Sequence, residues 1–240
     1  MLQEALQLAG STLAQVTDES SAIEALGHAP LLVPGEIENL KLTWPGDLPL
    51  AERWLAARAA AHPAITFRRL TDADLPMLHG WLHRPHVARW WLGEDDPPTL
   101  QDTVSDYGAA ALAQSSDELF IAHAAAEPIG FIQSYVAKGS GDGWWEDEVD
   151  PGVRGVDQFL SDGDRLNQGL GTRMLGAFVA RLFQDTAVTR VQADPHPANT
   201  RAIRCYSKVG FKPVREITTP DGPALLMVME RPAAAGATNP

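Results

Sequence analysis

The sequence predicts an α+β (α/β-like) domain that begins near residue 63 and ends near residue 231. From Ile65 onward, runs typical of strands alternate with runs of helical spacing. Glycines stand where one of these strands meets the following helix, around residues 166–172. A later helical run ends at Gly210, a position where a left-handed residue is favoured. Together these observations indicate a sheet whose strands are joined by helices and tight turns.

The elements of this domain are expected in a definite order. Strands are predicted over residues 65–70, 119–124, 129–137, 155–160, 188–193, 211–217 and 225–230. Helices are predicted from a capping box of Thr71 and Asp74 to Leu82, and over 100–113, 171–184 and 199–209. Pro85 is expected to end the first helix, because proline cannot continue the backbone hydrogen-bond ladder. Ala126-Glu127-Pro128 is expected to form the turn between the second and third strands.

The segments on either side of this domain differ from it in composition. Residues 1–62 are rich in Ala and Leu and carry no motif that we can interpret. Helical runs are expected over 1–16, over 22–26 and from a cap at Asp47 to Ala61, where Pro63 stops the chain from continuing as a helix. Residues 232–240 are mostly Ala, Gly and Pro and are expected to be disordered. The predicted organisation is therefore an extension (1–62), a domain (63–231) and a tail (232–240).

Composition excludes several classes of function. A formal net charge of -12 argues against a nucleic-acid partner, because phosphate backbones attract basic surfaces. No run approaches the roughly 20 apolar residues that a membrane helix needs. The N-terminus has no basic residue ahead of its apolar part, which argues against a secretory signal. With Cys205 as the only cysteine, no intramolecular disulfide can form, and a cytoplasmic location is expected. Whether the chain is a monomer or a homodimer stays open.

The glycine-rich junction has the sequence Leu166-Asn167-Gln168-Gly169-Leu170-Gly171-Thr172. Glycines before a helix let backbone N–H groups converge on an anion, and the helix N-terminus adds partial positive charge. Such a loop suits a pyrophosphate. It lacks the Gly-Lys-Ser/Thr of a P-loop and the third glycine of the dinucleotide fingerprint. An ordinary tight turn is the alternative interpretation.

The following helix, strand and second helix extend this pattern to Asn199-Thr200-Arg201-Ala202-Ile203-Arg204-Cys205-Tyr206-Ser207-Lys208-Val209-Gly210-Phe211. The whole arrangement resembles the general N-acetyltransferase (GNAT) superfamily. The resemblance implies the GNAT fold: a central mixed, mostly antiparallel sheet flanked by helices and splayed at the strand that binds acetyl-CoA. It implies acetyl-CoA as co-substrate, held by Gln168, Gly169, Gly171, Thr172 and Asn199, with Tyr206 near the CoA sulfur. Leu166 departs from the family pattern, which usually has Gln or Arg there.

The segment from Gly139 to Gln158 closely resembles aminoglycoside 6′-N-acetyltransferases. The likeness covers about residues 65–230, through Trp90-Trp91, Gln133-Ser134-Tyr135, Asp194-Pro195 and residues 218–223. It implies acetyl transfer to the 6′-amine of a cationic aminoglycoside, and hence antibiotic resistance. The residues that it implies for substrate binding are Trp91, Tyr107, Asp142, Trp144, Trp145, Glu146, Asp194 and Asp221.

Charge supports this interpretation. Between Asp142 and Asp164 lie eight carboxylates and one base, which suits a polycation. Trp144 and Trp145 can stack on sugar rings or contact ammonium groups. Attack on a thioester requires a free amine, so a carboxylate must first accept a proton. We assign Asp157, on the strand expected to hold acetyl-CoA, as this base and Tyr206 as the acid that can protonate the leaving thiolate.

Other interpretations remain open at this point. The acidic run can be a solvated surface, and one of the two tryptophans can be a core residue. A GNAT acyltransferase acting on another amine or a hydroxylamine, as in siderophore synthesis, is the alternative enzyme, and a non-catalytic binding module is the alternative outside enzymes. His79, His83 and His86 do not form a metal motif, because Pro85 interrupts their spacing, and no metal is expected. Cys205 is expected to be structural.

Overall fold

The structure, a computed structural model, describes residues 23–24, 27–29, 31, 41–92, 96–113, 115–141 and 143–232. The chain divides into two compact units, Met1–Arg58 and Ala59–Pro240. Most of α3 (Asp47–Ala61) lies in the first unit. The helix predicted over 1–16 and the tail beyond Pro232 lie outside the described residues.

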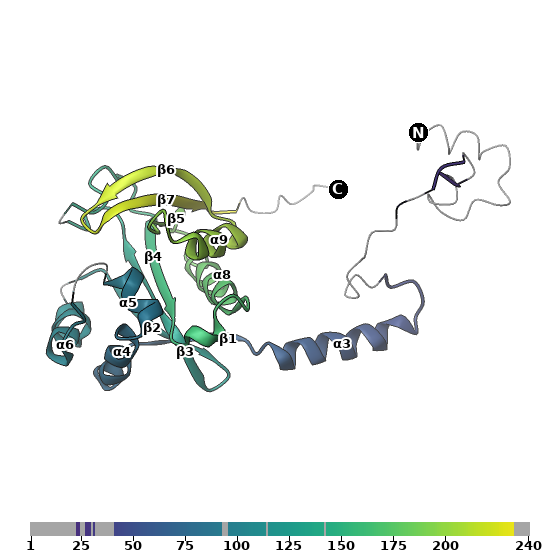
Figure 1. Ribbon diagram of the computed structural model, residues 1–240, viewed down its shortest axis with the longest axis horizontal. Helices are drawn as coiled ribbons and strands as arrows, with labels where there is room; N and C mark the ends of the chain where they lie inside the picture. The colour runs from purple at the N-terminus through teal and green to yellow at the C-terminus, as the bar shows by residue number, and fades with distance from the viewer. Residues whose placement is uncertain are drawn as a thin grey trace. The chain divides into compact units, whose positions relative to one another are not determined.

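Within the described part of the second unit, the strands form one seven-stranded sheet in the order β1-β2-β3-β4-β5-β7-β6 (Figure 1). Every neighbouring pair is antiparallel except β4 with β5, which are parallel. This confirms the predicted mixed, mostly antiparallel sheet. The strands are β1 (Ile65–Arg69), β2 (Glu118–Ala124), β3 (Glu127–Val136), β4 (Val153–Leu160), β5 (Arg190–Ala193), β6 (Lys212–Thr219) and β7 (Gly222–Glu230).

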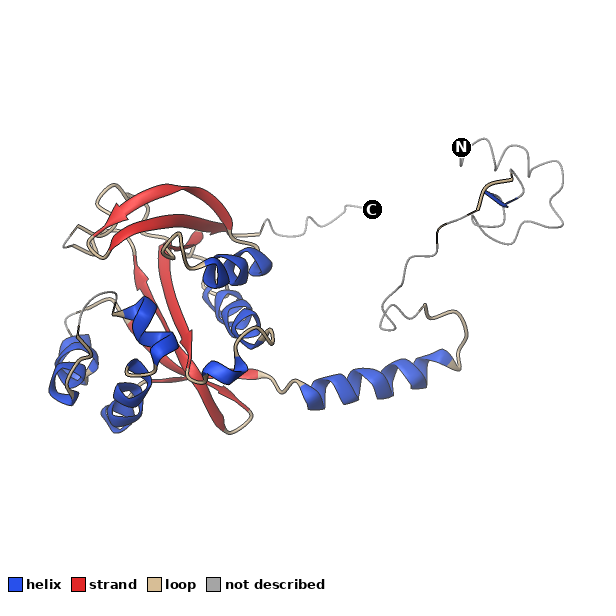
Figure 2. Ribbon diagram, in the orientation of Figure 1, coloured by secondary structure: helices blue, strands red, loops and turns tan. Residues whose placement is uncertain are grey.

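Helices cover both faces of this sheet (Figure 2). One face packs against α4 (Leu75–Leu82), α5 (Pro85–Trp91), α6 (Leu100–Tyr107) and α7 (Ala109–Leu112), and the other against α8 (Leu170–Leu182) and α9 (Thr200–Val209). Short 3₁₀ turns, η1 (Asp72–Asp74) and η2 (Gly163–Arg165), precede α4 and α8. Because strand side chains alternate between faces, Phe131 packs under α4 and α5 while its neighbour Ile132 packs under α8. None of the described helices is long and apolar enough to cross a membrane.

The sheet opens between β4 and β5. These strands pair at only three positions, from Val153 opposite Arg190 to Gly155 opposite Gln192. On its other side, β4 stays paired with β3 as far as Leu160. From Val156 onward, the β5-facing edge of β4 therefore has no strand partner. This confirms the predicted splay.

The first helix ends at Leu82, as predicted, but the sequence analysis missed the helix that follows. Pro85 begins α5, because its fixed φ and missing N–H suit the first helical position. The single helix predicted over 100–113 is broken at Gly108, which is extended (φ -73°, ψ 163°) and separates α6 from α7. A Cβ at Gly108 would lie 2.4 Å from the Val104 carbonyl oxygen, so the break depends on glycine.

The predicted caps had mixed outcomes. The capping box of Thr71 and Asp74 forms, although it opens η1 rather than α4 directly. The turn between β2 and β3 lies at Ala125 and Ala126, one residue earlier than predicted, so Glu127 already belongs to β3. Asp47 does not cap the first turn of α3, because its carboxylate accepts hydrogen bonds from two backbone N–H groups that precede it, those of Thr43 and Trp44.

Candidate active site

One face of the β3–β4 pair carries a row of aromatic and polar side chains. In the register, Phe131 lies opposite Phe159 and Gln133 opposite Asp157. Because every second residue of a strand points the same way, these four side chains share a face with Tyr135. This row forms the floor of the site.

Trp91 and Tyr107, both predicted to bind substrate, lie together over the aromatic part of this floor. The Trp91 ring meets Phe131 and Phe159 edge-on, at centroid distances of 5.7 and 4.9 Å. Trp91 Nε1–H donates a hydrogen bond of 2.9 Å to the Tyr107 hydroxyl. Burial raises the pKa of Tyr107, and the negative charge of Asp157 adds to the increase. The two residues therefore form an aromatic wall beside Asp157.

Asp157 is a buried acid whose hydrogen-bond partner and pKa shift are both given by the structure. Its Oδ2 accepts a hydrogen bond of 3.0 Å from Gln133 Nε2–H. Burial raises the pKa of Asp157 to about 6, the Gln133 bond opposes this increase, and the negative charges of Asp221 and Asp117 add to it. A carboxylate of this kind is ionised at neutral pH and yet takes up a proton more readily than an ordinary surface aspartate.

Asp194 and Asp221, which the sequence also predicts to bind substrate, interact electrostatically with Asp157 from other parts of the sheet. Asp194 directly follows β5, and Asp221 lies in the turn between β6 and β7. Burial first, and then the charges of Asp157 and Asp221, raise the pKa of Asp194 to about 8. Three aspartates that are far apart in sequence therefore interact at one place and are here called the aspartate cluster (Asp157, Asp194 and Asp221).

Trp145 joins the loop after β3 to the sheet. Its Nε1–H donates a hydrogen bond of 3.0 Å to the hydroxyl of Tyr135, a residue that the sequence analysis did not assign to the site. Trp145 has a positive φ of 49°, which is strained for a bulky residue and is often found at functional sites. The half-buried Trp144 lies beside it, with ring centroids 6.4 Å apart. The occurrence of Tyr135 in the Gln133-Ser134-Tyr135 segment was the available signal for its role.

The carboxylates of the acidic run, residues 142–164, do not all serve the same site. Glu148 forms an ion pair of 2.5 Å with Arg190 on β5. Asp150 accepts hydrogen bonds from Thr189 Oγ1 (2.6 Å) and from the backbone N–H of Gly152 (2.7 Å). These acids hold the loop to the sheet. Glu146, which the sequence predicts to bind substrate, is exposed, and Asp142 lies outside the described residues.

The glycine loop has the geometry of an anion site. Gly169 precedes α8 with a left-handed φ of 78°, and Asn167 has a positive φ of 64°. The first backbone hydrogen bond of the helix is from Arg173 N–H to the Gly169 carbonyl, at 3.0 Å. The preceding N–H groups, those of residues 170–172, have no carbonyl one turn back within the helix. They and the helix dipole suit a phosphate.

Two side chains predicted to hold the co-substrate have local partners instead. Gln168 Nε2–H donates to the Asp164 carbonyl at 2.8 Å. Asn199 caps α9, because its Oδ1 accepts from Ala202 N–H at 3.1 Å. Both stabilise the backbone around the proposed co-substrate site, and neither is required for the loop to present its N–H groups.

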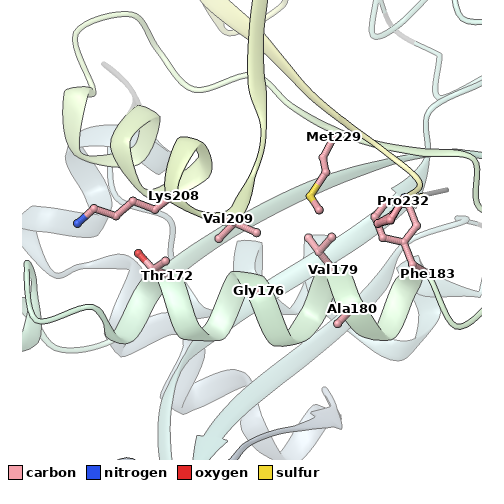
Figure 3. Close-up of a pocket in the computed structure, with 9 residues that line it drawn as sticks. All are labelled: Thr172, Gly176, Val179, Ala180, Phe183, Lys208, Val209, Met229 and Pro232. Carbon is pink, nitrogen blue, oxygen red and sulfur yellow. The ribbon is translucent and has the colours of Figure 1, made fainter. Parts of the chain in front are cut away.

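A groove of about 380 Å³ continues from the glycine loop along α8. Figure 3 shows Thr172 and Lys208 at one end of it and Phe183 and Pro232 at the other. Its walls come from α8, from the end of α9 and from β7, and its lining is mainly apolar: Gly176, Val179, Ala180, Val209 and Met229.

Tyr206 reaches the point where the sheet opens. Its hydroxyl donates to the carbonyl of Val156 at 3.4 Å, at the first β4 residue beyond the β5 pairing. The side chain is buried, and burial, followed by the charge of Asp157, raises its pKa well above the usual value. Tyr206 therefore carries its proton at neutral pH.

The neighbouring Cys205 is also enclosed, and burial raises the pKa of its thiol. Its Sγ lies 3.6 Å from both Gln158 Nε2 and Thr172 Oγ1. The histidines set aside in the sequence also have partners: His79 Nδ1 lies 3.2 Å from Thr103 Oγ1, and His86 Nε2 lies 2.9 Å from the Leu160 carbonyl. In the part of the chain that the structure describes, no group of three or more His, Cys, Asp or Glu side chains could hold a metal ion.

Comparison with known proteins separates the extension from the domain. Residues 1–57 match the family model of 2-C-methyl-D-erythritol 4-phosphate cytidylyltransferase. The cytidylyltransferase of Bordetella petrii is 58% identical over 55 residues, which are 23% of this chain and 25% of that protein. The sequence alone had indicated no relationship for this segment.

The remainder of the chain matches a different family. Residues 71–219 match the model of the acetyltransferase (GNAT) domain. Aminoglycoside N(6′)-acetyltransferase type 1 of Klebsiella pneumoniae is 52% identical over 173 residues, 72% of this chain and 86% of that protein. The crystal structure of the aminoglycoside acetyltransferase AAC(6′)-Ib with coenzyme A and kanamycin is 52% identical, covers 70% of this chain and 95% of its own, and superposes with a TM-score of 0.67. The chain therefore belongs to the GNAT acetyltransferases, in the group of the aminoglycoside N(6′)-acetyltransferases.

Proposed function

We propose that this protein transfers the acetyl group of acetyl-CoA to the 6′-amine of aminoglycoside antibiotics and so confers resistance to them. The observation that carries the proposal is the position of the aspartate cluster, between an aromatic wall and the open edge of β4. An aminoglycoside is a polycation, and its affinity for carboxylates and aromatic faces fits this surface. The similarity to a structure that holds coenzyme A and kanamycin supports the same conclusion.

The acetyl-CoA site is proposed along the opening of the sheet. Gly169 and Gly171 let the backbone N–H groups at the start of α8 approach the pyrophosphate, with Thr172 beside them. The unpaired edge of β4 from Val156 offers backbone groups to the pantetheine arm. The groove beyond Thr172, with its apolar floor and the Lys208 cation, fits the remaining end of CoA (Figure 3). Gln168 and Asn199 contribute by holding these segments in place.

The aminoglycoside site is proposed on the opposite side of Asp157. Trp91 and Tyr107 form one wall, and Trp144 and Trp145 form another. Asp221 attracts the ammonium groups of the drug, and Glu146 extends the negative charge to the rim. Asp194, whose pKa is about 8 in the free protein, ionises when a bound ammonium group stabilises its charge. Asp142, which the sequence assigns to the same role, belongs to the proposal on the family resemblance alone.

The proposed reaction is direct transfer. Asp157 removes a proton from the 6′-ammonium, and the freed amine nitrogen attacks the thioester carbonyl carbon. The carbon–sulfur bond breaks as the carbon–nitrogen bond forms. Tyr206, which holds its proton at neutral pH beside the opening, gives that proton to the leaving thiolate. The nitrogen loses its second proton as the amide forms, and this proton restores the Tyr206 hydroxyl through water, so that one proton, the one taken by Asp157, is released overall. The products are the acetamide and CoA with a free thiol.

Residues 1–62 and the cellular location of the protein complete the proposal. Residues 1–62 stand outside the chemistry, since the GNAT match begins at residue 71 and the segment before it matches an unrelated family. A cytoplasmic location is proposed because Cys205 is the only cysteine.

Release of free thiol from acetyl-CoA tests the function. Kanamycin should stimulate release, and mass spectrometry should find one acetyl group on the 6′-nitrogen. A hydroxylamine acceptor, as used in siderophore synthesis, should be far less effective. Tight binding of kanamycin without thiol release would indicate a binding module, and a preference for the hydroxylamine would indicate the alternative acyltransferase.

A further inference from the structure

Gln133 stands directly opposite Asp157 in the β3–β4 register. Its Nε2–H donates to Asp157 Oδ2 at 3.0 Å. The residue follows Phe131 and Ile132, which are fully buried, so its polar amide lies in a largely enclosed part of the strand. Because backbone pairing fixes the distance between opposite residues, the amide meets one oxygen of the carboxylate without any movement of the strands. The described residues donate no hydrogen bond to the other oxygen, Oδ1, which is therefore left for a ligand.

The surroundings of Asp157 otherwise favour its neutral form. The carboxylates of Asp221 and Asp117 raise the pKa of Asp157. The charge of Asp157 in turn raises the pKa of four groups that face it from neighbouring elements: Asp194, Tyr107, Tyr135 and Tyr206. Burial and the nearby carboxylates both oppose the ionisation of Asp157. Among the described residues, the Gln133 amide is the group that stabilises the charged form of Asp157.

A neutral donor suits this position better than a cation. Lys or Arg opposite Asp157 would bind the carboxylate more strongly and weaken it as a base. It would also repel the ammonium group of the acceptor. An apolar residue would leave Asp157 protonated more of the time. An amide avoids both effects, because it orients and stabilises the carboxylate without adding charge.

We infer that Gln133 is a positioning residue for the acetyl transfer: it holds Asp157 by Oδ2, keeps it ionised and leaves Oδ1 for the acceptor amine. The inference rests on the proposed function, in which Asp157 is the base. Gln133 itself does not contact acetyl-CoA and takes no part in bond formation or proton transfer. Its effect should therefore appear only through the protonation state and the orientation of Asp157.

The test is the pH profile of kcat/KM for kanamycin in Gln133→Met and Gln133→Glu. Methionine has similar length and flexibility but no donor, so it keeps the packing and removes the hydrogen bond. We expect its acid limb to move upward by about one pH unit from about pH 6, which is roughly a fivefold loss at pH 6 that shrinks toward pH 9. Glutamate also adds like charge and should shift the limb further. Acetyl-CoA affinity, measured by calorimetry, should stay unchanged in both variants.

Gln184→Met, at an exposed position after α8, is the matched control and should keep the wild-type profile. In an Asp157→Asn background, Gln133→Met should cost little more, because the residue through which it acts is gone. If wild-type enzyme does not acetylate kanamycin, the proposed function fails. If wild type is active, Asp157→Asn is inactive and both Gln133 variants keep the wild-type acid limb, the function stands and the inference about Gln133 is overturned.

Discussion

The ring of Tyr135 lies directly against Gly155 on the neighbouring strand, and a Cβ built on Gly155 would stand 2.2 Å from Tyr135 Cζ. Gly155 is also the last residue of β4 that pairs with β5. The absence of a side chain at this position therefore lets an aromatic ring cover the sheet where it begins to open. Because the hydroxyl of Tyr135 holds the indole of Trp145, this contact also sets the position of the loop above the site.

Gly155→Ala should displace the Tyr135 ring and release Trp145. Overpacking of this kind costs about 1–3 kcal/mol of unfolding free energy. We expect a lower melting temperature and a raised KM for kanamycin, with little change in acetyl-CoA affinity. Gly80→Ala is the control, since no atom outside the nearby backbone of α4 and the chain neighbours of Gly80 lies within 4 Å of a Cβ at this position. An unchanged KM in a stable Gly155→Ala variant would separate Tyr135 from substrate binding.

Asp157→Asn should remove most turnover and leave acetyl-CoA binding nearly intact. The substitution keeps the shape of the side chain but removes the charge and the proton acceptor. A positioned general base contributes roughly 10²–10⁴-fold, so the loss should appear in kcat. In the wild type, kcat/KM should fall below about pH 6, where the raised pKa of Asp157 leaves the base protonated. Near wild-type turnover of the variant across pH 6 to 9 would assign the base to another group.

Asp194→Asn should stabilise the fold at alkaline pH while weakening drug binding. The folded-state pKa of Asp194 is raised to about 8, well above the unfolded value near 3.9, so its ionisation opposes folding as the pH rises between these values. Asparagine removes this cost, and a gain of about 0.5–2 kcal/mol is typical of such replacements. Thermal melts should show a larger gain at pH 9 than at pH 5, together with a raised KM for kanamycin. A gain independent of pH would argue against the raised pKa.

Gly171→Ala should weaken acetyl-CoA binding without harming the fold. Outside its chain neighbours and its own helix backbone, the atoms nearest to a Cβ at Gly171 are Cys205 Sγ and Leu160 side-chain atoms, at ordinary distances of 3.8–3.9 Å, so the protein itself has room for it. The pyrophosphate would lose its close approach to the backbone, and we expect about a tenfold rise in Kd, equivalent to roughly 1.4 kcal/mol. Gly169 is a poorer test, since its φ of 78° would strain any side chain. A normal Kd for folded Gly171→Ala would exclude the loop as the phosphate site.

A chain that begins at Pro63 should keep its turnover. The site residues lie after this point, and the contact from Arg173 to the Pro63 carbonyl, at 2.5 Å, is retained. We expect kcat and both KM values within about twofold of the full chain, although the melting temperature can fall. Loss of activity by a truncated chain that still binds acetyl-CoA would show that the extension contributes to the acceptor site.

Local sequence signals determined the ends of several elements. Asn199 and Gly210 mark the two ends of α9, because an Asx cap and a left-handed glycine act on adjacent backbone groups. The glycine loop could be placed for the same reason. The same local reasoning was incomplete at Pro85: it placed the end of the first helix correctly but missed the start of α5. Proline can stop one helix and start the next, and packing of the following segment decides whether a new helix forms.

The sequence by itself determined the order of strands and helices, the family resemblance and the residue types of the site, because these depend on spacing along the chain. Only the tertiary structure decided which acids act together. Glu148 and Asp150 hold the loop to β5, whereas Asp194 and Asp221 reach Asp157 from distant strands. The pairing of Gln133 with Asp157 also depends on the β3–β4 register, and a shift of one residue would turn either side chain to the other face of the sheet. Register and burial arise from contacts between segments far apart in the chain, so no local pattern specifies them.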